Sequence, residues 1–104
     1  MGTNGLALGQ QDEINRAYAP VICRHLSKVK EVDGLYALEA DDGVIHIYTV
    51  VGEFESKIYD KLLPRERVIE KECPDIHFDF HVRAHQGREP ALAVPFDSRV
   101  IFTR

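Results

Sequence analysis

Apolar residues follow a helical spacing between Gln11 and Val29. Successive apolar positions are alternately three residues and one residue apart, which places them on one face of a helix. Pro20 lies inside this segment, and a kink or a break is expected there because proline lacks a backbone N–H and clashes with the preceding turn. Residues 1–10 show no such pattern. We therefore expect a flexible N-terminus followed by one domain over residues 11–104.

The segment from Leu35 to Val51 is predicted to fold back on itself as a hairpin. Asp42-Gly43 indicates a two-residue turn between strands at 35–41 and 44–51. Such a turn sets the register, and the register determines which residues share a face. The predicted core face carries the pairs Ala40–Ile45, Leu38–Ile47 and Tyr36–Thr49, and the other face carries Glu39–His46, Ala37–Tyr48 and Leu35–Val50.

A helical segment and a strand are expected after the hairpin. Helical spacing returns from Glu53 to Cys73, but Pro64 disfavours helical geometry at the residue before it. Two helical segments, 54–63 and 64–72, are therefore predicted, with Pro64 as the first residue of the second. Apolar and polar residues then alternate over 76–83, which is typical of a strand with one buried face.

The C-terminal part of the chain is rich in turn residues and prolines. Pro90 and Pro95 keep the apolar segment Ala91–Phe96 out of a central strand, so it is predicted to be an edge, a loop or a partner-facing arm. A short last strand is expected at 100–103. The predicted fold class is α+β, with two layers: a mainly antiparallel sheet of three or four strands with helices on one face, in the order α-β-β-α(kinked)-β-β. The predicted core comprises Ile14, Tyr18, Ile22, Leu38, Ile45, Ile47, Ile58, Leu62, Ile69, Phe78 and Phe80.

Length and composition limit what this domain can do. With 104 residues it is too small for a large enclosed cleft with a lid, which excludes large multi-substrate enzymes. A formal charge of −4 is unlike the basic balance of most nucleic-acid binders. No apolar run approaches the roughly 18 residues of a membrane-spanning helix, and no secretion signal is recognisable, so a cytoplasmic protein without membrane contact is expected.

The polar face of the strand at 76–83 carries the most informative residues. His77, Asp79 and His81 alternate with apolar residues and project from one face, about 6.5–7 Å apart along the strand. Two imidazoles and a carboxylate suit zinc or another divalent transition metal, with His46 of the hairpin, or His85 at the end of the strand, as a fourth group. The alternative is a solvated polar sheet face in which Asp and His are favourable neighbours.

A general acid–base pair is a further possibility at Glu39 and His46. The predicted register places the two side chains opposite each other, and a neighbouring carboxylate raises the pKa of an imidazole. Most such pairs are only local charge complements. The chain also lacks the glycine-rich and nucleophile motifs of the common hydrolases, phosphate-binding enzymes and dinucleotide-binding enzymes, so a non-enzymatic role is favoured.

The leading hypothesis is therefore a small binding or assembly module that requires no cofactor. Its partner would be a protein, including a second copy of this chain in a homo-oligomer. The contact would use the open sheet face or the arm at 91–96, because these segments carry more apolar residues than a monomer needs outside its core. The candidate partner-binding residues are Tyr48, Val50, Leu92, Val94 and Phe96.

A third hypothesis is RNA binding. The order helix, strand, strand, broken helix, strand resembles small KH-like modules in topology alone, and such modules clamp RNA with a Gly-x-x-Gly loop. The corresponding junction here, from Leu62 to Arg67, contains Arg65 and Arg67 but no glycine. A solvated basic helix face is the favoured explanation of these arginines, so nucleic acid is not an expected partner.

Overall fold

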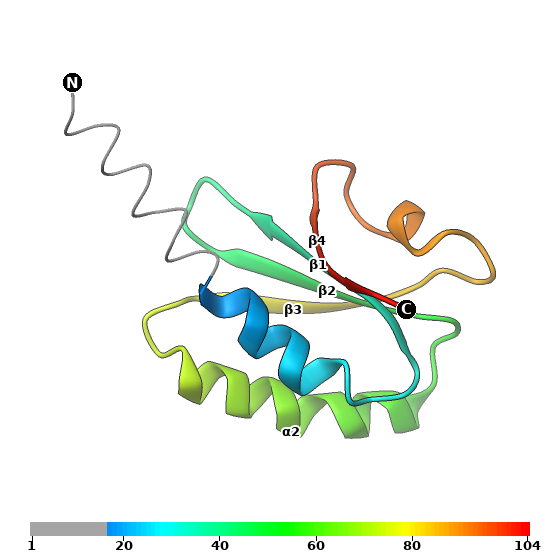
Figure 1. The fold of residues 1–104 in the computed structure, drawn as a ribbon, viewed down its shortest axis with the longest axis horizontal. Coiled ribbons are helices and arrows are strands. Elements are labelled where there is room, and N and C mark those ends of the chain that lie inside the picture. Colours follow the sequence, from blue (N-terminus) through cyan, green and yellow to red (C-terminus); the bar gives the residue numbers. More distant parts are fainter. Residues whose placement is uncertain (1–16) are drawn as a thin grey trace.

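The computed structural model describes residues 17–104, which form a four-stranded sheet with two helices on one face (Figure 1). Within the described residues, the first helix extends to residue 26 from residue 17, the first that is described. The later elements are the strands β1 (Val32–Glu39) and β2 (Ile45–Val51), the helix α2 (Ser56–Glu72), the strand β3 (Phe78–Ala84), the 3₁₀ helix η1 (Pro90–Ala93) and the strand β4 (Arg99–Thr103). The predicted α+β class is confirmed. The expected N-terminal segment 1–10 lies outside the described residues.

The sheet is mixed, which corrects the prediction of a mainly antiparallel sheet. Its strand order is β3-β2-β1-β4, and β1 is antiparallel to both of its neighbours. However, β3 runs parallel to β2. The connection explains this direction, because α2 carries the chain back along the sheet and a helical crossover joins parallel strands.

The hairpin between β1 and β2 is present, but the predicted two-residue turn is wrong. The Gly43 N–H donates to the Ala40 carbonyl at 3.0 Å, and the Ala40 N–H donates to the Val44 carbonyl at 2.9 Å. Three residues therefore form the loop, and the last of them, Gly43, has φ +87°. This is the three-residue hairpin in which a turn is followed by a glycine bulge, and only glycine adopts that conformation without strain.

The longer loop shifts the register by one residue and exchanges the two faces of β1. Ala37 lies opposite Ile47, and Leu38 lies opposite His46. Because side chains alternate along a strand, a shift of one residue reverses which side faces the core. Leu35 and Ala37 consequently join the core, whereas Leu38, predicted to be a core residue, lies on the opposite face.

Both prolines predicted to disturb the helices are accommodated. α2 continues from Ser56 to Glu72 with Pro64 inside it, which contradicts the predicted division into two segments. Pro64 has no N–H to donate to the Asp60 carbonyl, one turn earlier in the helix. Both residues are exposed, so water can donate a hydrogen bond to that carbonyl instead. The first helix likewise runs through Pro20. Neither helix, over its described residues, is long and apolar enough to span a membrane.

The hydrophobic core lies between the helices and the sheet. Tyr18 packs edge-on against Phe78, with ring centroids 5.8 Å apart. Phe80, a predicted core residue, is only partly buried at the margin of the core, because β3 is an edge strand. Ile14, another predicted core residue, lies outside the described residues. Cys73 packs partly buried against the core, and neither described cysteine forms a disulfide. The predicted core residues found buried are Tyr18, Ile22, Ile45, Ile47, Ile58, Leu62, Ile69 and Phe78.

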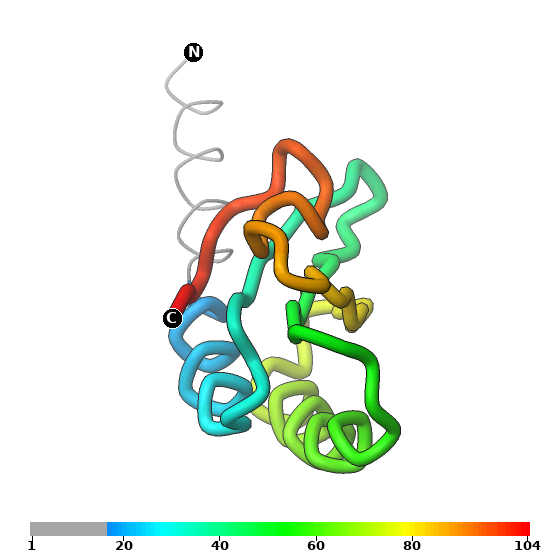
Figure 2. The backbone as a smooth tube through the Cα atoms, turned by 90° about the vertical axis from the view of Figure 1, so that its right-hand side faces the viewer, coloured from blue at the N-terminus to red at the C-terminus, as the bar shows by residue number. Residues whose placement is uncertain are grey.

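The segment between β3 and β4 folds back over the sheet face that the helices leave open. Figure 2 shows it on the far side of the sheet from both helices. Ala93 and Val94 pack there against Tyr36, Tyr48 and Val50. The predicted arm therefore covers part of its own sheet.

Candidate functional site

The uncovered part of this open face is formed by two parallel neighbours, β2 and β3. His46 lies beside Asp79, and Tyr48 lies beside His81, in the register of the two strands. Alternate residues of a strand share a face, so these four side chains form a compact group. The parallel direction is essential, because it brings the start of β2 beside the start of β3.

Three potential ligand atoms converge in this group, which we call the His46–Asp79–His81 cluster. His46 Nδ1 lies 2.9 Å from His81 Nε2, and one of the two nitrogens donates to the other. Asp79 Oδ2 lies 3.5 Å from His81 Nε2 and 3.7 Å from His46 Nδ1. One ligand atom from each residue fits within 4.8 Å of the other two.

Aromatic stacking holds the His81 ring in place. It stacks on the Tyr48 ring with centroids 4.8 Å apart. The His46 ring lies edge to edge with the His81 ring, to which it is hydrogen-bonded, with centroids 5.2 Å apart. Tyr48 is only 6% exposed, because the arm residues Ala93 and Val94 pack around it. The cluster is thus supported from the buried side and remains open to solvent, since the Asp79 side chain is 54% exposed.

The surroundings favour a neutral His81. Burial is the main cause that lowers the pKa of His81, and the charge of Asp79 raises it. Charge repulsion from Arg83, and from His46 whenever that ring is protonated, lowers it further. A lowered pKa keeps the imidazole unprotonated at neutral pH. An unprotonated nitrogen is the form that binds a metal ion.

His77, predicted as a ligand in the same row, is not part of this cluster. It precedes β3 by one residue and is exposed. Its carbonyl accepts a hydrogen bond from the Ile45 N–H at 2.8 Å, which starts the parallel ladder. Of the four predicted metal ligands, the structure brings together His46, Asp79 and His81.

Glu39 and His46, the predicted acid–base pair, lie on opposite faces of the sheet. The corrected register places Glu39 opposite Ile45, and the Glu39 carboxylate accepts a hydrogen bond from Arg99. The Tyr18 hydroxyl, on the first helix, donates a hydrogen bond to the Glu39 carboxylate and accepts one from Arg99. Glu39 therefore belongs to the helix side of the sheet.

The five predicted partner-binding residues occupy different environments. Tyr48 and Val50 are buried, and Val94 is half-buried against them. Leu92 and Phe96, in contrast, are 73% and 104% exposed. Of the five predicted partner-binding residues, these two alone have most of the side chain exposed.

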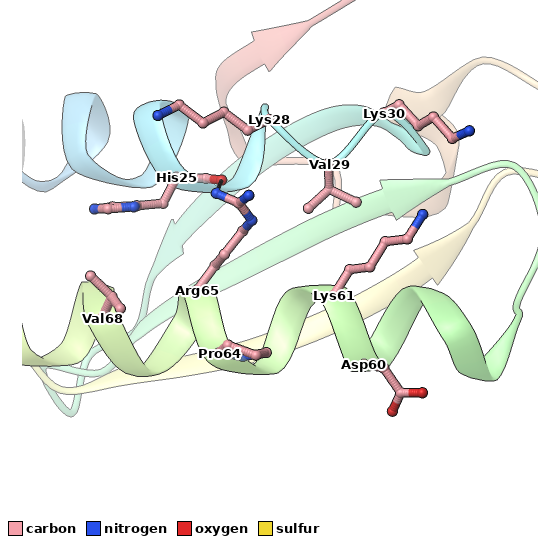
Figure 3. A pocket seen from close by; sticks show the side chains of 9 residues that line it. All are labelled: His25, Lys28, Val29, Lys30, Asp60, Lys61, Pro64, Arg65 and Val68. Atoms are coloured by element: carbon pink, nitrogen blue, oxygen red, sulfur yellow. Dashed lines mark hydrogen bonds between the residues drawn. The ribbon is translucent and has the colours of Figure 1, made fainter.

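A basic groove of about 630 Å³ between the first helix and α2 is a feature that the linear sequence does not reveal (Figure 3). Its cations come from both sides of the groove and meet only through the tertiary fold. Arg65 Nη1 donates to the His25 carbonyl, and Lys61 Nζ lies 2.6 Å from a Glu31 carboxylate oxygen. These two cations therefore join the first helix and its following turn to α2. Arg67 points to a different part of the surface, beside Glu70 and Pro74.

The His46–Asp79–His81 cluster is the group best suited to chemistry. Zinc–nitrogen bonds of about 2.0–2.1 Å in a tetrahedral site place neighbouring ligand atoms about 3.3 Å apart. The observed separations of 2.9, 3.5 and 3.7 Å lie on both sides of that value.

Comparison with protein-family models, with curated proteins and with solved structures finds no match to this chain.

Proposed function

We propose that this domain binds a divalent transition metal ion through His46, Asp79 and His81. The observation that carries the proposal is the convergence of two imidazole nitrogens and a carboxylate oxygen within 4.8 Å on one sheet face. Two histidines and one carboxylate suit zinc, iron and cobalt, and leave at least one coordination position free.

The surroundings of the cluster support a preformed site. His81 is fixed by stacking on Tyr48, and the ligands come from adjacent regular strands rather than from loops. Ligands held by rigid elements lose less conformational entropy when they bind an ion. A hydrogen-bonded polar face without metal affinity is the competing explanation, and the two differ in one measurable quantity.

That quantity is the affinity of the purified, untagged protein for Zn²⁺, measured by calorimetry and by thermal unfolding. At an ion concentration of 100 times the dissociation constant, the wild type should gain about 2.7 kcal/mol of stability. For a domain of this size the gain corresponds to a melting temperature higher by about 10 °C or more.

Two variants and one matched control make the test specific. Asp79→Asn and His81→Ala should each remove most of the stabilisation by zinc. His77→Ala removes an exposed histidine of the same strand region and should leave it unchanged. A wild type that gains no stability from zinc, or a His77→Ala variant that loses as much as His81→Ala, would overturn the proposal.

We also propose self-association as a second function, because the arm presents Leu92 and Phe96 to solvent. The structure buries Tyr48 and Val50, so the contact would use the outer side of the arm rather than the sheet beneath it. Light scattering coupled to gel filtration at tens of micromolar tests this role. A dimer that Phe96→Asp dissociates is expected, and a monomeric wild type rejects it.

A further inference from the structure

Arg83 extends the polar row of the open face beyond the cluster. It follows His81 by two residues on β3, so both side chains project from the same face. Its guanidinium carbon lies 5.3 Å from the centroid of the Tyr48 ring, and that ring stacks on His81. A positive charge is therefore held one side chain away from a proposed metal ligand.

The N–H groups of Arg83 remain available. Among residues 17–104 no carboxylate forms an ion pair with Arg83, and the closest acidic residue of the row, Asp79, faces the two imidazoles instead. A guanidinium over an aromatic ring uses its face for that contact, whereas its donors lie in its plane. Arg83 can thus donate to a bound anion without leaving Tyr48.

The charges of the loaded site define the anion. A divalent ion and Arg83 contribute three positive charges, Asp79 contributes one negative charge, and neutral imidazoles contribute none. The remaining charge of +2 matches a dianion. Three protein ligands also leave a coordination position to which an oxygen of that anion can bind.

Resting on the proposed metal site, we infer that the metal ion and Arg83 together bind a phosphoryl group. One phosphate oxygen would coordinate the ion, and the other oxygens would accept hydrogen bonds from the guanidinium. A carboxylate satisfies this arrangement less well, because it carries one negative charge and has a single oxygen left once the other binds the metal. The 54% exposure of the Asp79 side chain leaves the position accessible from solvent.

The test uses the Co²⁺-loaded protein, because the visible spectrum of Co²⁺ changes when a ligand enters its coordination sphere. Inorganic phosphate is titrated into the wild type and into Arg83→Gln, and methyl phosphate and acetate serve as parallel ligands. We expect phosphate affinity to be about tenfold or more weaker in Arg83→Gln, with Co²⁺ affinity unchanged. Methyl phosphate should bind like inorganic phosphate if an esterified group is accepted, and acetate should bind more weakly than either.

Arg67→Gln is the matched control, since it removes the same charge from a surface of α2 away from the cluster. An equal loss of phosphate affinity in both variants would mean that only net charge matters, and would overturn the inference. Phosphate binding of equal strength with and without Co²⁺, measured by calorimetry, would overturn it as well.

The two proposals fail in different ways. Absence of Co²⁺ binding in the wild type would reject the metal site, and the phosphoryl site with it. Binding of Co²⁺ without any spectral response to phosphate would reject only the phosphoryl site. Thermal unfolding of Arg83→Gln without ligands verifies that the variant is folded, and Arg83→Lys should recover part of the phosphate affinity, since it keeps the charge but not the planar donor geometry.

Discussion

The two faces of the sheet are built from the same strands but differ in what covers them. On the helix side, β2 contributes Ile45, Ile47 and Val51 to a continuous apolar core. On the other side, the alternate residues of β2 include His46 and Tyr48, and the arm residues Ala93 and Val94 cover part of this face. The first face is stabilised by burial, and the second keeps hydrogen-bonding groups within reach of solvent.

This difference separates the residues that stabilise the fold from those of the proposed metal site. An unpaired polar group on a helix-covered face costs stability, so that face is a poor place for metal ligands. The open face can hold imidazoles and a carboxylate because Tyr48 and the arm protect it on one side only. Substitutions on the two faces should therefore have different consequences, which the following experiments measure.

The largest effect is expected at Ile47, which is fully buried on the helix side. Ile47→Ala should lower the free energy of unfolding by about 3–4 kcal/mol, because it removes buried methyl groups and leaves a cavity. Urea denaturation measures this loss. Val100→Ala, at a position 58% exposed, is the control and should change stability by less than about 0.5 kcal/mol. Similar losses in the two variants would contradict the assignment of the core to the helix side.

The next effect concerns Glu66, a carboxyl on the helix layer. Burial, with a smaller contribution from the charge of Glu70, raises the pKa of Glu66 to about 7. Between its ordinary pKa of 4.5 and 7, the unfolded chain releases this proton while the folded chain retains it. Stability should consequently fall as the pH rises through this window and stay reduced above it.

Glu66→Gln cannot ionise, so it should remove this penalty. At pH 8 we expect the variant to be about 1–2 kcal/mol more stable than the wild type, a value reduced from the full linkage because the carboxyl is still partly solvated. Near pH 4.5 the two proteins should differ little. Glu70→Gln should reproduce only a minor part of the gain, and an equal gain at both pH values would show that the pKa of Glu66 is not raised.

Much of the fold could be predicted from local patterns, but the pairing of strands could not. The alternation through Phe78, Asp79, Phe80 and His81 predicts a strand correctly, and it does not reveal whether that strand runs parallel to its neighbour. The predicted register of the hairpin is wrong for a related reason. Both faces of β1 contain apolar residues, so the pattern does not decide between a two-residue turn and the three-residue loop that ends at Gly43.

The candidate site was predictable in its residue types and only partly in its membership. Asp79 and His81 share a face by period two, and His46 lies beside them because of the parallel pairing. His77 follows the same period, but the strand begins after it, which spacing alone cannot show. The stacking of Tyr48 and the position of Arg83 depend on the fold, although the two-residue step from His81 to Arg83 is a signal that could have been used.

A smaller effect is expected at Thr49, which is fully buried on the helix side and whose hydroxyl has no hydrogen-bond partner among the described residues. Thr49→Val replaces that hydroxyl with a methyl group of similar size. The variant should gain about 1 kcal/mol, since an unpaired buried hydroxyl is costly. Denaturation of Thr103→Val, at an exposed threonine, provides the baseline, and a loss of stability at Thr49 would show that its hydroxyl is satisfied.

The smallest effect tests the cover of the open face. Val94 packs on Tyr36, Tyr48 and Val50, yet it is only half-buried. Val94→Ala should cost about 0.5–1 kcal/mol, because the arm has solvent on its other side and can settle into the space that is left. Leu92→Ala, in the same arm but 73% exposed, should cost almost nothing at protein concentrations too low for self-association. If Val94→Ala were instead as damaging as Ile47→Ala, the arm would be a second structural layer rather than a cover, and the open face would be part of the folding core. A small loss supports the opposite conclusion, that the strands owe their stability to the helix side and leave the His46–Asp79–His81 cluster free to exchange its hydrogen bonds for a metal ion.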